Sequence, residues 1–302
     1  MAQIDDSHYQ GADLYSDGDI EDEILAMVRS GTSPEELLRQ DNRWPVLYHL
    51  APERRNLLEW YPFRPEARLL EVGAGCGALT GLFCERVAEV QAVELSRRRS
   101  QIIYERHRQR DNLRIMVGNL ADIRLTEKFD YIALIGVLEY AGAFMPGPDP
   151  YRQLLRRLAE MLQPDGVIFV ALENKFGLKY FAGAAEDHTS RLFEGIEGYP
   201  GNGPARTFAR NELEQLLQEA GLTRHTFYYP HPDYKLPREV FSDEFPPQPG
   251  HLLGAAPNYD HERLRLLNET RAWVNIIRAG QFPSFANSFL VTAGVTQPGA
   301  TT

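Results

Sequence analysis

Three alternate glycines and two glutamates have the types and spacing that a cofactor site requires. Gly73, Gly75 and Gly77 follow an apolar run that ends just after Glu71. Alternate glycines let the backbone bend sharply beneath a flat ligand, with few side chains in the way. Glu94 lies about 20 residues beyond the turn, where an acidic side chain accepts hydrogen bonds from ribose hydroxyls. The pattern predicts a site for a cofactor that contains a nucleoside.

The glycine spacing alone does not separate two classes of cofactor. Gly73-x-Gly75-x-x-Ala78 satisfies the loose form of the dinucleotide fingerprint, which keeps NAD and hydride transfer open. Glu71 favours S-adenosylmethionine, because its carboxylate repels a pyrophosphate and attracts an ammonium or a sulfonium. Unit charges about 4 Å apart interact by roughly 4 kcal/mol at an effective dielectric of about 20, so the sign of the ligand charge matters.

Alternating strand and helix patterns predict the elements that position these residues. The predicted strands lie near 67–72, 90–94, 113–117, 130–135, 167–172, 226–229 and 288–292. The predicted helices of the core lie near 78–87, 97–109, 150–162 and 208–220. This alternation predicts an α/β fold with a doubly wound, Rossmann-like sheet of seven mostly parallel strands. Ligands of such sheets bind at the carboxyl ends of the strands.

Several motifs, taken in order, resemble those of class I S-adenosylmethionine-dependent methyltransferases. They are Glu71-x-Gly73-x-Gly75-x-Gly77, Glu94, Gly118-Asn119-Leu120-Ala121-Asp122, Phe129-Asp130-Tyr131 and Pro164-Asp165-Gly166. The resemblance covers residues 63–293. It implies S-adenosylmethionine as cofactor, S-adenosylhomocysteine as product, and an antiparallel last strand at one edge of the sheet.

The resemblance also implies a role for each matching residue. The glycine turn and Glu71 would hold the methionine end, Glu94 the ribose, and Asn119 and Leu120 the adenine, while residues 136–138 would form the floor beneath the sulfonium. The family often has aspartate at the position of Asn119. The implied cofactor-binding residues are Glu71, Gly73, Ala74, Gly75, Gly77, Glu94, Leu95, Asn119, Leu120, Gly136, Val137 and Leu138.

Composition limits the partners. The formal net charge of −10 is the opposite of a nucleic-acid footprint, so no nucleic-acid partner is expected. The basic run at 97–99, followed by Arg106, Arg108 and Arg110, is interpreted as a solvated helix face. Two cysteines form neither a disulfide framework nor a metal spacing, so no metal is predicted. The lack of a basic leader or a long apolar run favours a cytoplasmic protein that does not insert into membranes.

Segments outside the core divide the chain further. Residues 1–62 form a helical leader or lid, with helices expected from 20, from 34 and over 52–60. Residues 1–19 are acidic and expected to be flexible unless they pack on a ligand, with Tyr9 and Tyr15 as lid or anchor. The tail, residues 294–302, is expected to be flexible.

Two insertions, at 174–207 and 230–286, interrupt the core, and a helix is expected near 260–279 within the second. Insertions of this length usually form lids or substrate walls, although they also serve as subdomains that only add stability. The Glu-Asn-Lys-Phe-Gly segment from 173 and the Glu-Asp-His segment from 186 resemble, more loosely, bacterial methyltransferases associated with polysaccharide or secondary-metabolite biosynthesis.

Three residues are candidates for catalysis. His188 is the first candidate base, because an imidazole titrates near neutral pH, and Glu139 and Tyr140 lie closer in sequence to the predicted methyl position. The alternatives are a surface histidine and a structural or cofactor-binding role for the other two. The candidate substrate-binding residues are Glu173, Asn174, Lys179, Tyr180 and Asp187. Lys175, Lys179 and Arg191 are candidates for binding an anionic acceptor, such as a carboxylate, a phosphate or a uronic sugar, and are otherwise solvated loop cations.

The combined prediction is a methyltransferase (EC 2.1.1.-) that acts on a small-molecule or glycan-type acceptor, with oxygen slightly preferred over nitrogen as the acceptor atom. Positioning is worth roughly 7 to 11 kcal/mol in such a transfer, and a base adds about 10²- to 10⁴-fold. A non-catalytic cofactor-binding module of a biosynthetic complex is the alternative, and an NAD-dependent oxidoreductase is a weaker one. A homodimer or a biosynthetic enzyme partner is compatible with the sequence.

Overall fold

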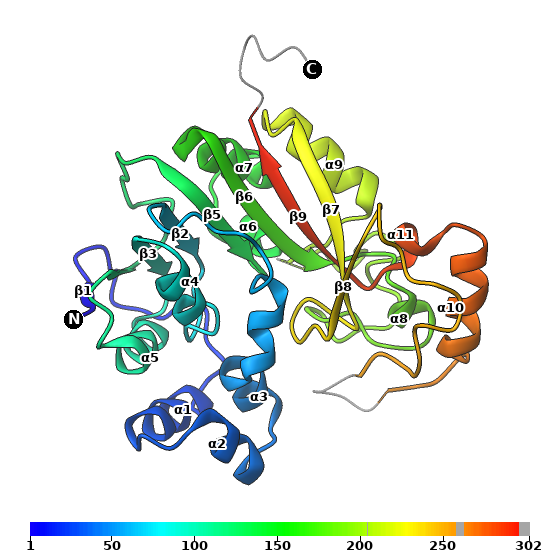
Figure 1. Ribbon diagram of the computed structural model, residues 1–302, viewed down its shortest axis with the longest axis horizontal. Coiled ribbons are helices and arrows are strands. Elements are labelled where there is room, and N and C mark those ends of the chain that lie inside the picture. The colour runs from blue at the N-terminus through cyan, green and yellow to red at the C-terminus, as the bar shows by residue number, and fades with distance from the viewer. Residues whose placement is uncertain (204, 258–262, 296–302) are drawn as a thin grey trace. The chain divides into compact units, whose positions relative to one another are not determined.

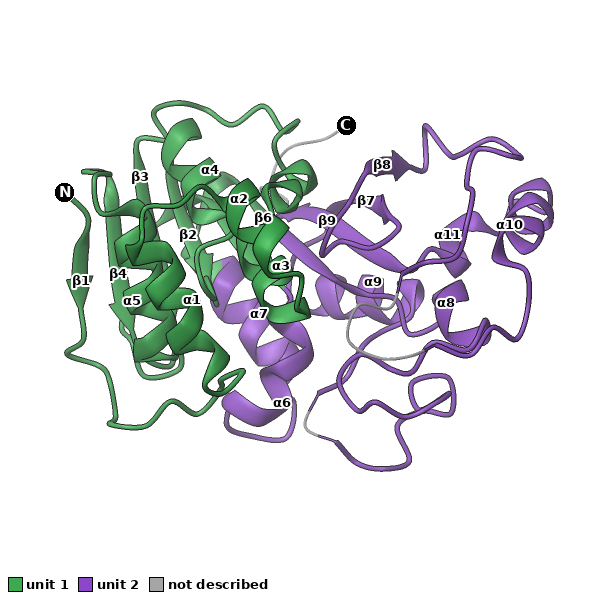
Figure 2. Cartoon of the chain, turned by 90° about the horizontal axis from the view of Figure 1, so that it is seen from below, with its two compact units in different colours: residues 1–135, 160–168 green, residues 136–159, 169–302 purple. Residues whose placement is uncertain are grey.

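The computed structural model describes residues 1–203, 205–257 and 263–295 (Figure 1). The chain divides into two compact units (Figure 2). Unit 1 comprises residues 1–135 and 160–168, and unit 2 comprises residues 136–159 and 169–302. The division falls within strand β6 (Leu162–Glu173), so each unit contains part of this strand. Unit 1 therefore unites the predicted leader with the first half of the predicted core.

Unit 1 contains a sheet with the strand order β1-β4-β3-β2-β5-β6, in which the pairs from β1 to β5 are parallel. Its strands are β1 (Gln3–Asp5), β2 (Arg68–Val72), β3 (Glu89–Glu94), β4 (Leu113–Val117) and β5 (Phe129–Ile135). The central strands are nearly continuous apolar runs, because a parallel sheet is covered on both faces. Their registers place Val72 opposite Val93 and Glu94 opposite Val117, so the carboxyl ends align at one edge.

Helices of the leader and the core accompany this sheet. They are α1 (Ile20–Arg29), α2 (Pro34–Gln40), α3 (Trp44–Leu50), the 3-10 helix η1 (Pro52–Leu57), α4 (Thr80–Arg86) and α5 (Arg97–His107). Ser33 caps α2, because its hydroxyl accepts a hydrogen bond from the backbone N–H of Glu36 at 3.3 Å. Ile24 of α1 and Ile102 of α5 belong to one buried cluster, so the leader is part of the core of unit 1.

The expectation that residues 1–19 are flexible is wrong. Gln3–Asp5 pair in parallel with β4 and extend the sheet by one strand. The ring of Tyr15 lies 4.7 Å from the guanidinium carbon of Arg99, which anchors the segment before α1. A strand of three residues is too short to produce a recognisable alternation, so the pairing was not visible in the sequence.

The interpretation of the basic run as a solvated helix face is wrong for Arg99, which is only 5% exposed. Its Nε lies 2.6 Å from Glu21 Oε1 and its Nη2 lies 2.8 Å from Asp17 Oδ2. Arg97, by contrast, is exposed on the same helix. Arg99 thus joins α5 to the leader through a buried ion pair.

Replacing Arg99 with alanine is expected to destabilise the chain by about 3 to 5 kcal/mol, because the fully buried carboxylate of Glu21 would lose its 2.6 Å ion pair and keep, among the described residues, only the pair with Arg98 at 4.0 Å. Urea unfolding monitored by tryptophan fluorescence measures this loss. Arg97→Ala is the matched control, since the side chain of Arg97 is 62% exposed and its ion pair with Asp6 lies at the surface. Equal losses in the two variants would contradict a buried anchoring role.

Unit 2 contains the strand order β6-β9-β7-β8, and both β7·β9 and β7·β8 are antiparallel. Its remaining strands are β7 (Arg224–His231), β8 (Glu239–Ser242) and β9 (Ser288–Gly294). Its helices are the 3-10 helix η2 (Leu138–Tyr140), α6 (Ala141–Phe144), most of α7 (Pro150–Met161), α8 (Leu178–Phe181), α9 (Arg210–Glu219), α10 (Glu269–Arg278) and α11 (Phe282–Phe285).

The α/β fold with a mostly parallel sheet and an antiparallel last strand is confirmed, but seven strands is wrong. The described residues form nine strands, and the two that were not predicted are the short strands β1 and β8.

The helix expected from 260 begins only at Glu269 in α10, and residues 258–262 lie outside the described residues. Of the predicted flexible tail, Gly294 closes β9, and residues 296–302 lie outside the described residues. Among the described helices, none has the length and apolar character to cross a membrane.

Candidate active site

The glycine turn follows β2 in unit 1. Gly73, Gly75 and Gly77 have φ values of 68°, 56° and 77°, in the left-handed region that side chains other than glycine rarely adopt. The backbone N–H of Gly73 donates to the carbonyl of Val93 at 2.8 Å, so the turn is held against β3. An added Cβ at Gly75 would meet no described atom within 4 Å, which leaves open space over the turn.

Glu71 lies beneath this turn and is 5% exposed. Its Oε2 accepts a hydrogen bond from the hydroxyl of Thr80 at 2.6 Å. Burial raises the pKa of the Glu71 carboxyl group to about 8, and the charge of Glu94 adds to the rise. This rise favours the protonated carboxyl group at neutral pH, and a cation beside it would favour the carboxylate.

Glu94 ends β3 and connects it to the turn. Its Oε2 accepts from the backbone N–H of Gly75 at 2.7 Å, and its Oε1 accepts from that of Ser96 at 2.9 Å. Burial raises the pKa of Glu94, although the nearby charge of Arg99 opposes the rise. Each carboxylate oxygen keeps a second lone pair for a ligand hydroxyl.

The predicted adenine residues follow the adjacent strand β4. Asn119 lies two residues beyond Val117, the last residue of β4, and Leu120 is 6% exposed. The side-chain oxygen of Asn119 accepts a hydrogen bond from the backbone N–H of Ala121 at 2.9 Å, so it holds its own loop. The structure therefore brings Glu71, Glu94 and Asn119 to one edge of the sheet, as the alternation of strands predicted.

Gly136, Val137 and Leu138 belong to unit 2 and directly follow β5 in the chain. The backbone N–H of Gly136 donates to the carbonyl of Ala171 at 2.8 Å. Gly136 has a φ of 68°, and an added Cβ would lie 2.8 Å from the hydroxyl oxygen of Tyr234. Only glycine fits this position without a shift of its neighbours. The role of these three residues beneath a sulfonium stays a prediction.

The central feature of unit 2 is a buried group formed by Glu139, Glu173 and His188. One side-chain ligand atom of each lies within 4.8 Å of those of the other two. Both glutamates are 0% exposed, and neither oxygen of Glu139 has a hydrogen-bond partner in the described residues. Burial raises the pKa of Glu139, and the charge of Glu173 raises it further. We call these three residues the acidic cluster.

His188 is not a surface residue, because its side chain is only 6% exposed. Its Nδ1 lies 2.9 Å from Glu186 Oε1, and its Nε2 lies 3.9 Å from Glu173 Oε2. The ring of Tyr140 packs edge-on against the imidazole, with 5.2 Å between ring centroids. Burial alone would lower the pKa of His188, but Glu173 and Glu186 outweigh burial and raise it to about 9.

A buried lysine, Lys179, and a partly buried one, Lys235, border the acidic cluster, and both have carboxylate partners. Lys179 Nζ lies 2.7 Å from Asp233 Oδ2 and 3.0 Å from Asp187 Oδ2. Lys235 contacts Glu173 and lies 2.6 Å from Asp187 Oδ1. These cations lower the pKa of Asp187 well below its usual range, against the effect of burial. Lys179 is thus not a solvated loop cation.

Other candidate residues of the first insertion hold the backbone in place. The amide nitrogen of Asn174 donates to the carbonyls of Ser284 and Ala286 at 2.9 and 2.8 Å. Tyr180 donates its hydroxyl to Asp187 at 2.6 Å. Lys175 pairs with Glu212 at 2.6 Å, whereas the side chain of Arg191 is 63% exposed, as a solvated cation should be.

The described residues with positive φ other than glycine all lie in this insertion. They are Ser190, Phe193, Tyr199 and Asn202. Tyr199 is held by a 2.5 Å hydrogen bond between its hydroxyl and that of Thr207. Such backbone conformations cost of order 1 to 3 kcal/mol each and cluster at functional sites, which favours a binding role for the insertion over mere stabilisation.

Comparison with known families decides the class of protein. The sequence model of a methyltransferase domain matches residues 43–226, more than half of the chain. The chain belongs to the methyltransferase domain family. The resemblance seen in the motifs is therefore confirmed, and family membership supports S-adenosylmethionine as the cofactor.

Two curated relatives match parts of this chain. The dTDP-4-amino-2,3,4,6-tetradeoxy-D-glucose N,N-dimethyltransferase of Saccharopolyspora spinosa is 32% identical over 132 residues, 42% of this chain and 51% of that enzyme. The ribosomal RNA small subunit methyltransferase A of Geobacter metallireducens is 37% identical over 68 residues, 22% of this chain and 25% of that enzyme. The chain thus spans about half and a quarter of their lengths.

A solved structure shares the fold. Phosphoethanolamine N-methyltransferase 1 of Haemonchus contortus, in complex with phosphoethanolamine and S-adenosylhomocysteine, aligns with a TM-score of 0.51 at 12% identity. The alignment covers 93% of this chain and 50% of that one. At this identity the likeness concerns the fold alone.

The carboxyl edge of unit 1 fits the charge of S-adenosylmethionine. Glu71 and Glu94 are buried carboxyl groups with raised pKa values, and such groups gain from a nearby cation. The open space above Gly75 leaves room for a ligand. The cofactor carries an ammonium and a sulfonium, whereas the pyrophosphate of NAD would meet two carboxyl groups. The two carboxyl groups at this edge of the methyltransferase domain thus suit a cofactor that carries a sulfonium.

Binding of S-adenosylhomocysteine at pH 7 is expected to release a proton from Glu71, because the ligand's ammonium favours the carboxylate of a group whose pKa in the free chain is about 8. Calorimetry in buffers of different ionisation enthalpy counts this proton. Glu71→Gln keeps an acceptor for Thr80 and should release correspondingly fewer protons.

The raised pKa of the Glu71 carboxyl group also predicts that the stability of the chain depends on pH. Its folded pKa lies above the unfolded value, so its contribution to stability is fully present below about pH 4.3 and is lost as pH rises through about 8. The unliganded Glu71→Gln variant should therefore lose less stability than the wild type between pH 6 and pH 9. Identical proton counts and pH profiles in the two chains would contradict a protonated Glu71.

Sequence reasoning missed the groups that complete the acidic cluster. Glu186 was visible beside His188, but nothing local marked it as the partner of the imidazole. Asp233 and Lys235 lie about 50 residues further along in a proline-rich insertion, without a recognisable spacing to the cluster. No sequence signal short of covariation among related chains would have found them.

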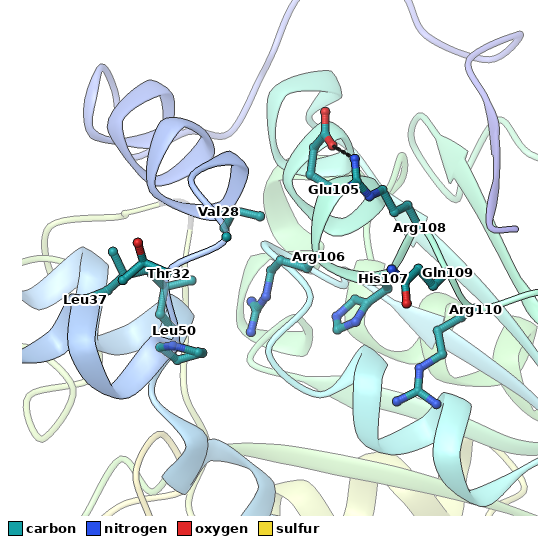
Figure 3. A pocket seen from close by; sticks show the side chains of 12 residues that line it. Val28, Thr32, Leu37, Leu50, Glu105, Arg106, His107, Arg108, Gln109 and Arg110 are labelled. Carbon is teal, nitrogen blue, oxygen red and sulfur yellow. Dashed lines mark ion pairs between the residues drawn. The ribbon is translucent and has the colours of Figure 1, made fainter.

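Unit 1 also holds a cavity of about 640 Å³, lined by α1, α2, α3 and the end of α5 (Figure 3). Arg106 in its wall donates to the backbone carbonyls of His49 and Cys76, at 2.9 and 2.5 Å. Glu105 and Arg108 form an ion pair at its rim, as Figure 3 shows. The glycines of the turn do not line this cavity, but Arg106 and His107 of its wall contact the carbonyls of Cys76 and Gly77 in the turn.

Proposed function

We propose that the chain transfers a methyl group from S-adenosylmethionine to a hydroxyl group of a small-molecule or glycan-type acceptor. The proposal of a hydroxyl acceptor depends on one observation. The carboxyl group of Glu139 is buried, and its oxygens have no hydrogen-bond partner in the described residues. An acceptor hydroxyl supplies the missing donor. Its oxygen becomes a better nucleophile as its proton moves to the carboxylate.

The remaining residues bind and position. The cofactor supplies an electrophilic methyl group attached to a good leaving group. Glu71 and Glu94 bind its positive and hydroxyl groups, and Asn119 orients its base. Such positioning contributes more than proton removal, at roughly 7 to 11 kcal/mol against about 3 to 5.

His188 is assigned to positioning. Both of its ring nitrogens face carboxylates, Glu186 on one side and Glu173 on the other, so neither is directed at an acceptor alone. Tyr140 supports the imidazole from its edge. Lys179, Tyr180 and Asp187 hold the wall of the acceptor site through their mutual contacts rather than as free anion-binding groups.

An amine is the second candidate acceptor. The Saccharopolyspora spinosa relative is named as an N,N-dimethyltransferase of an amino sugar, and a buried acidic site also suits an amino group. An amine needs the same proton removal, since only its neutral form attacks the methyl carbon.

The decisive experiment offers the purified chain S-adenosylmethionine with paired nucleotide sugars that differ only in carrying a hydroxyl or an amino group. Mass spectrometry reports the added methyl group and its position. O-methylation supports the first proposal and N-methylation the second. Tight binding of S-adenosylmethionine by calorimetry without turnover of any acceptor would favour the non-catalytic module, and preferential binding of NAD would contradict both.

A further inference from the structure

The residues around the acidic cluster carry more negative than positive groups. The carboxyl groups are Glu139, Glu173, Glu186, Asp187 and Asp233, and the cationic or basic groups are Lys179, Lys235 and His188. A buried negative charge without a countercharge is costly. With all of these groups ionised, five carboxylates face three positive charges, so the site has two negative charges in excess and gains from a bound cation.

The unbalanced charge lies where three ligand atoms converge. Glu139 comes from η2, Glu173 from the end of β6, and His188 from the first insertion, and their ligand atoms lie within 4.8 Å of one another. Both oxygens of Glu139 and Oε2 of Glu173 have no hydrogen-bond partner in the described residues, and both side chains are fully buried. A buried acceptor without a donor costs about 1 to 3 kcal/mol, and a cation removes that cost.

A further contact orients the imidazole for coordination. Glu186 Oε1 lies 2.9 Å from His188 Nδ1, and Glu186 Oε2 accepts from the backbone N–H of Thr189 at 2.8 Å. This leaves Nε2 facing Glu173 at 3.9 Å. A histidine that donates one ring N–H to a carboxylate and turns its other nitrogen to the site is the usual arrangement of a metal-bound histidine.

We propose that Glu139, Glu173 and His188 bind one divalent first-row metal ion in unit 2, with Glu186 orienting the imidazole. Two carboxylate oxygens and one imidazole nitrogen suit Mn²⁺ or Zn²⁺ and leave coordination positions open. The sequence showed no metal spacing because the three ligands come from separate segments. Use of the ion to bind and acidify the acceptor oxygen rests on the proposed function, whereas binding of the ion does not.

The experiment titrates the full chain, freed of metal by chelation, with Mn²⁺ and follows the loss of the free-ion signal by electron paramagnetic resonance. One Mn²⁺ per chain is expected, with displacement by Zn²⁺. Glu139→Gln and His188→Gln should each weaken binding by about tenfold or more, and Glu186→Gln by about 10- to 100-fold. Glu197→Gln, an exposed glutamate of the same insertion, is the control and should leave binding unchanged.

Two outcomes would overturn the proposal. One is the absence of Mn²⁺ and Zn²⁺ binding at millimolar concentration. The other is metal binding whose affinity is unchanged in both Glu139→Gln and His188→Gln. Affinity for S-adenosylhomocysteine shows that each variant is folded, and the His188 variant serves alone if Glu139→Gln does not fold. No acceptor is needed, so failure of methyl transfer with intact metal binding would contradict only the proposed function. Methyl transfer unaffected by chelation, in a chain that binds no metal, would contradict only the metal site.

Discussion

Replacing Glu139 with glutamine is expected to lower the rate of methyl transfer to a hydroxyl acceptor by about 10²- to 10⁴-fold. Glutamine has nearly the shape of glutamate, but its amide does not accept the acceptor's proton. Affinity for S-adenosylhomocysteine should stay close to that of the wild type, because the carboxylates proposed to bind the cofactor, Glu71 and Glu94, are unchanged. Transfer of a labelled methyl group at saturating cofactor measures the rate, and calorimetry measures the affinity.

Two comparisons make this prediction specific. Glu197→Gln changes the same functional group at an exposed position and should keep the wild-type rate. An excess of Mn²⁺ separates the two roles assigned to Glu139, metal ligand and proton acceptor. The excess restores the methyl-transfer rate if Glu139→Gln has only lost metal affinity, and it does not restore the rate if the variant has lost its proton acceptor. A rate within threefold of the wild type, without added metal, would remove Glu139 from the reaction.

Replacing Glu94 with alanine is expected to weaken binding of S-adenosylhomocysteine by about 1 to 3 kcal/mol, or roughly 5- to 150-fold. The carboxylate is proposed to bind the ribose, and it also holds the backbone N–H groups of Gly75 and Ser96. Its loss would therefore free the glycine turn as well as remove a ligand contact. The methyl-transfer rate at saturating cofactor should change less than the affinity.

Glu89→Ala is the matched control for this experiment, because Glu89 begins the same strand β3 at the end away from the turn. Its carboxylate pairs with Arg68 at the surface, where an ion pair contributes about 0 to 1 kcal/mol. Calorimetry on the two variants separates a local effect from a general weakening of the strand. Unchanged affinity in Glu94→Ala would exclude Glu94 from the cofactor site.

The central strands and the cofactor turn were predictable because their signals are local. Leu113–Val117 was predicted to the residue, and the strand before the turn to within one residue. A parallel strand covered on both faces must be a continuous apolar run, and a tight turn with positive φ must be glycine. Each of these constraints acts within a few residues of the chain.

The edge strands and the leader were harder to predict. β1 has three residues and β8 has four, so neither shows an alternation long enough to recognise. Arg99 appeared to belong to a solvated basic face because its partner Glu21 lies 78 residues earlier. A charge is interpreted as exposed by default until its countercharge is known.

The sequence by itself determined the class of this protein, a methyltransferase domain, together with the carboxyl edge of unit 1 that holds Glu71 and Glu94. Only the tertiary structure showed that Glu139, Glu173 and His188 meet, that Lys179 and Lys235 are paired with carboxylates, and that His188 faces two carboxylates. The physical reason is that apolar periodicity and glycine conformation are properties of neighbouring residues. The energy of a buried charge, by contrast, depends on groups that loops bring together from distant parts of the chain.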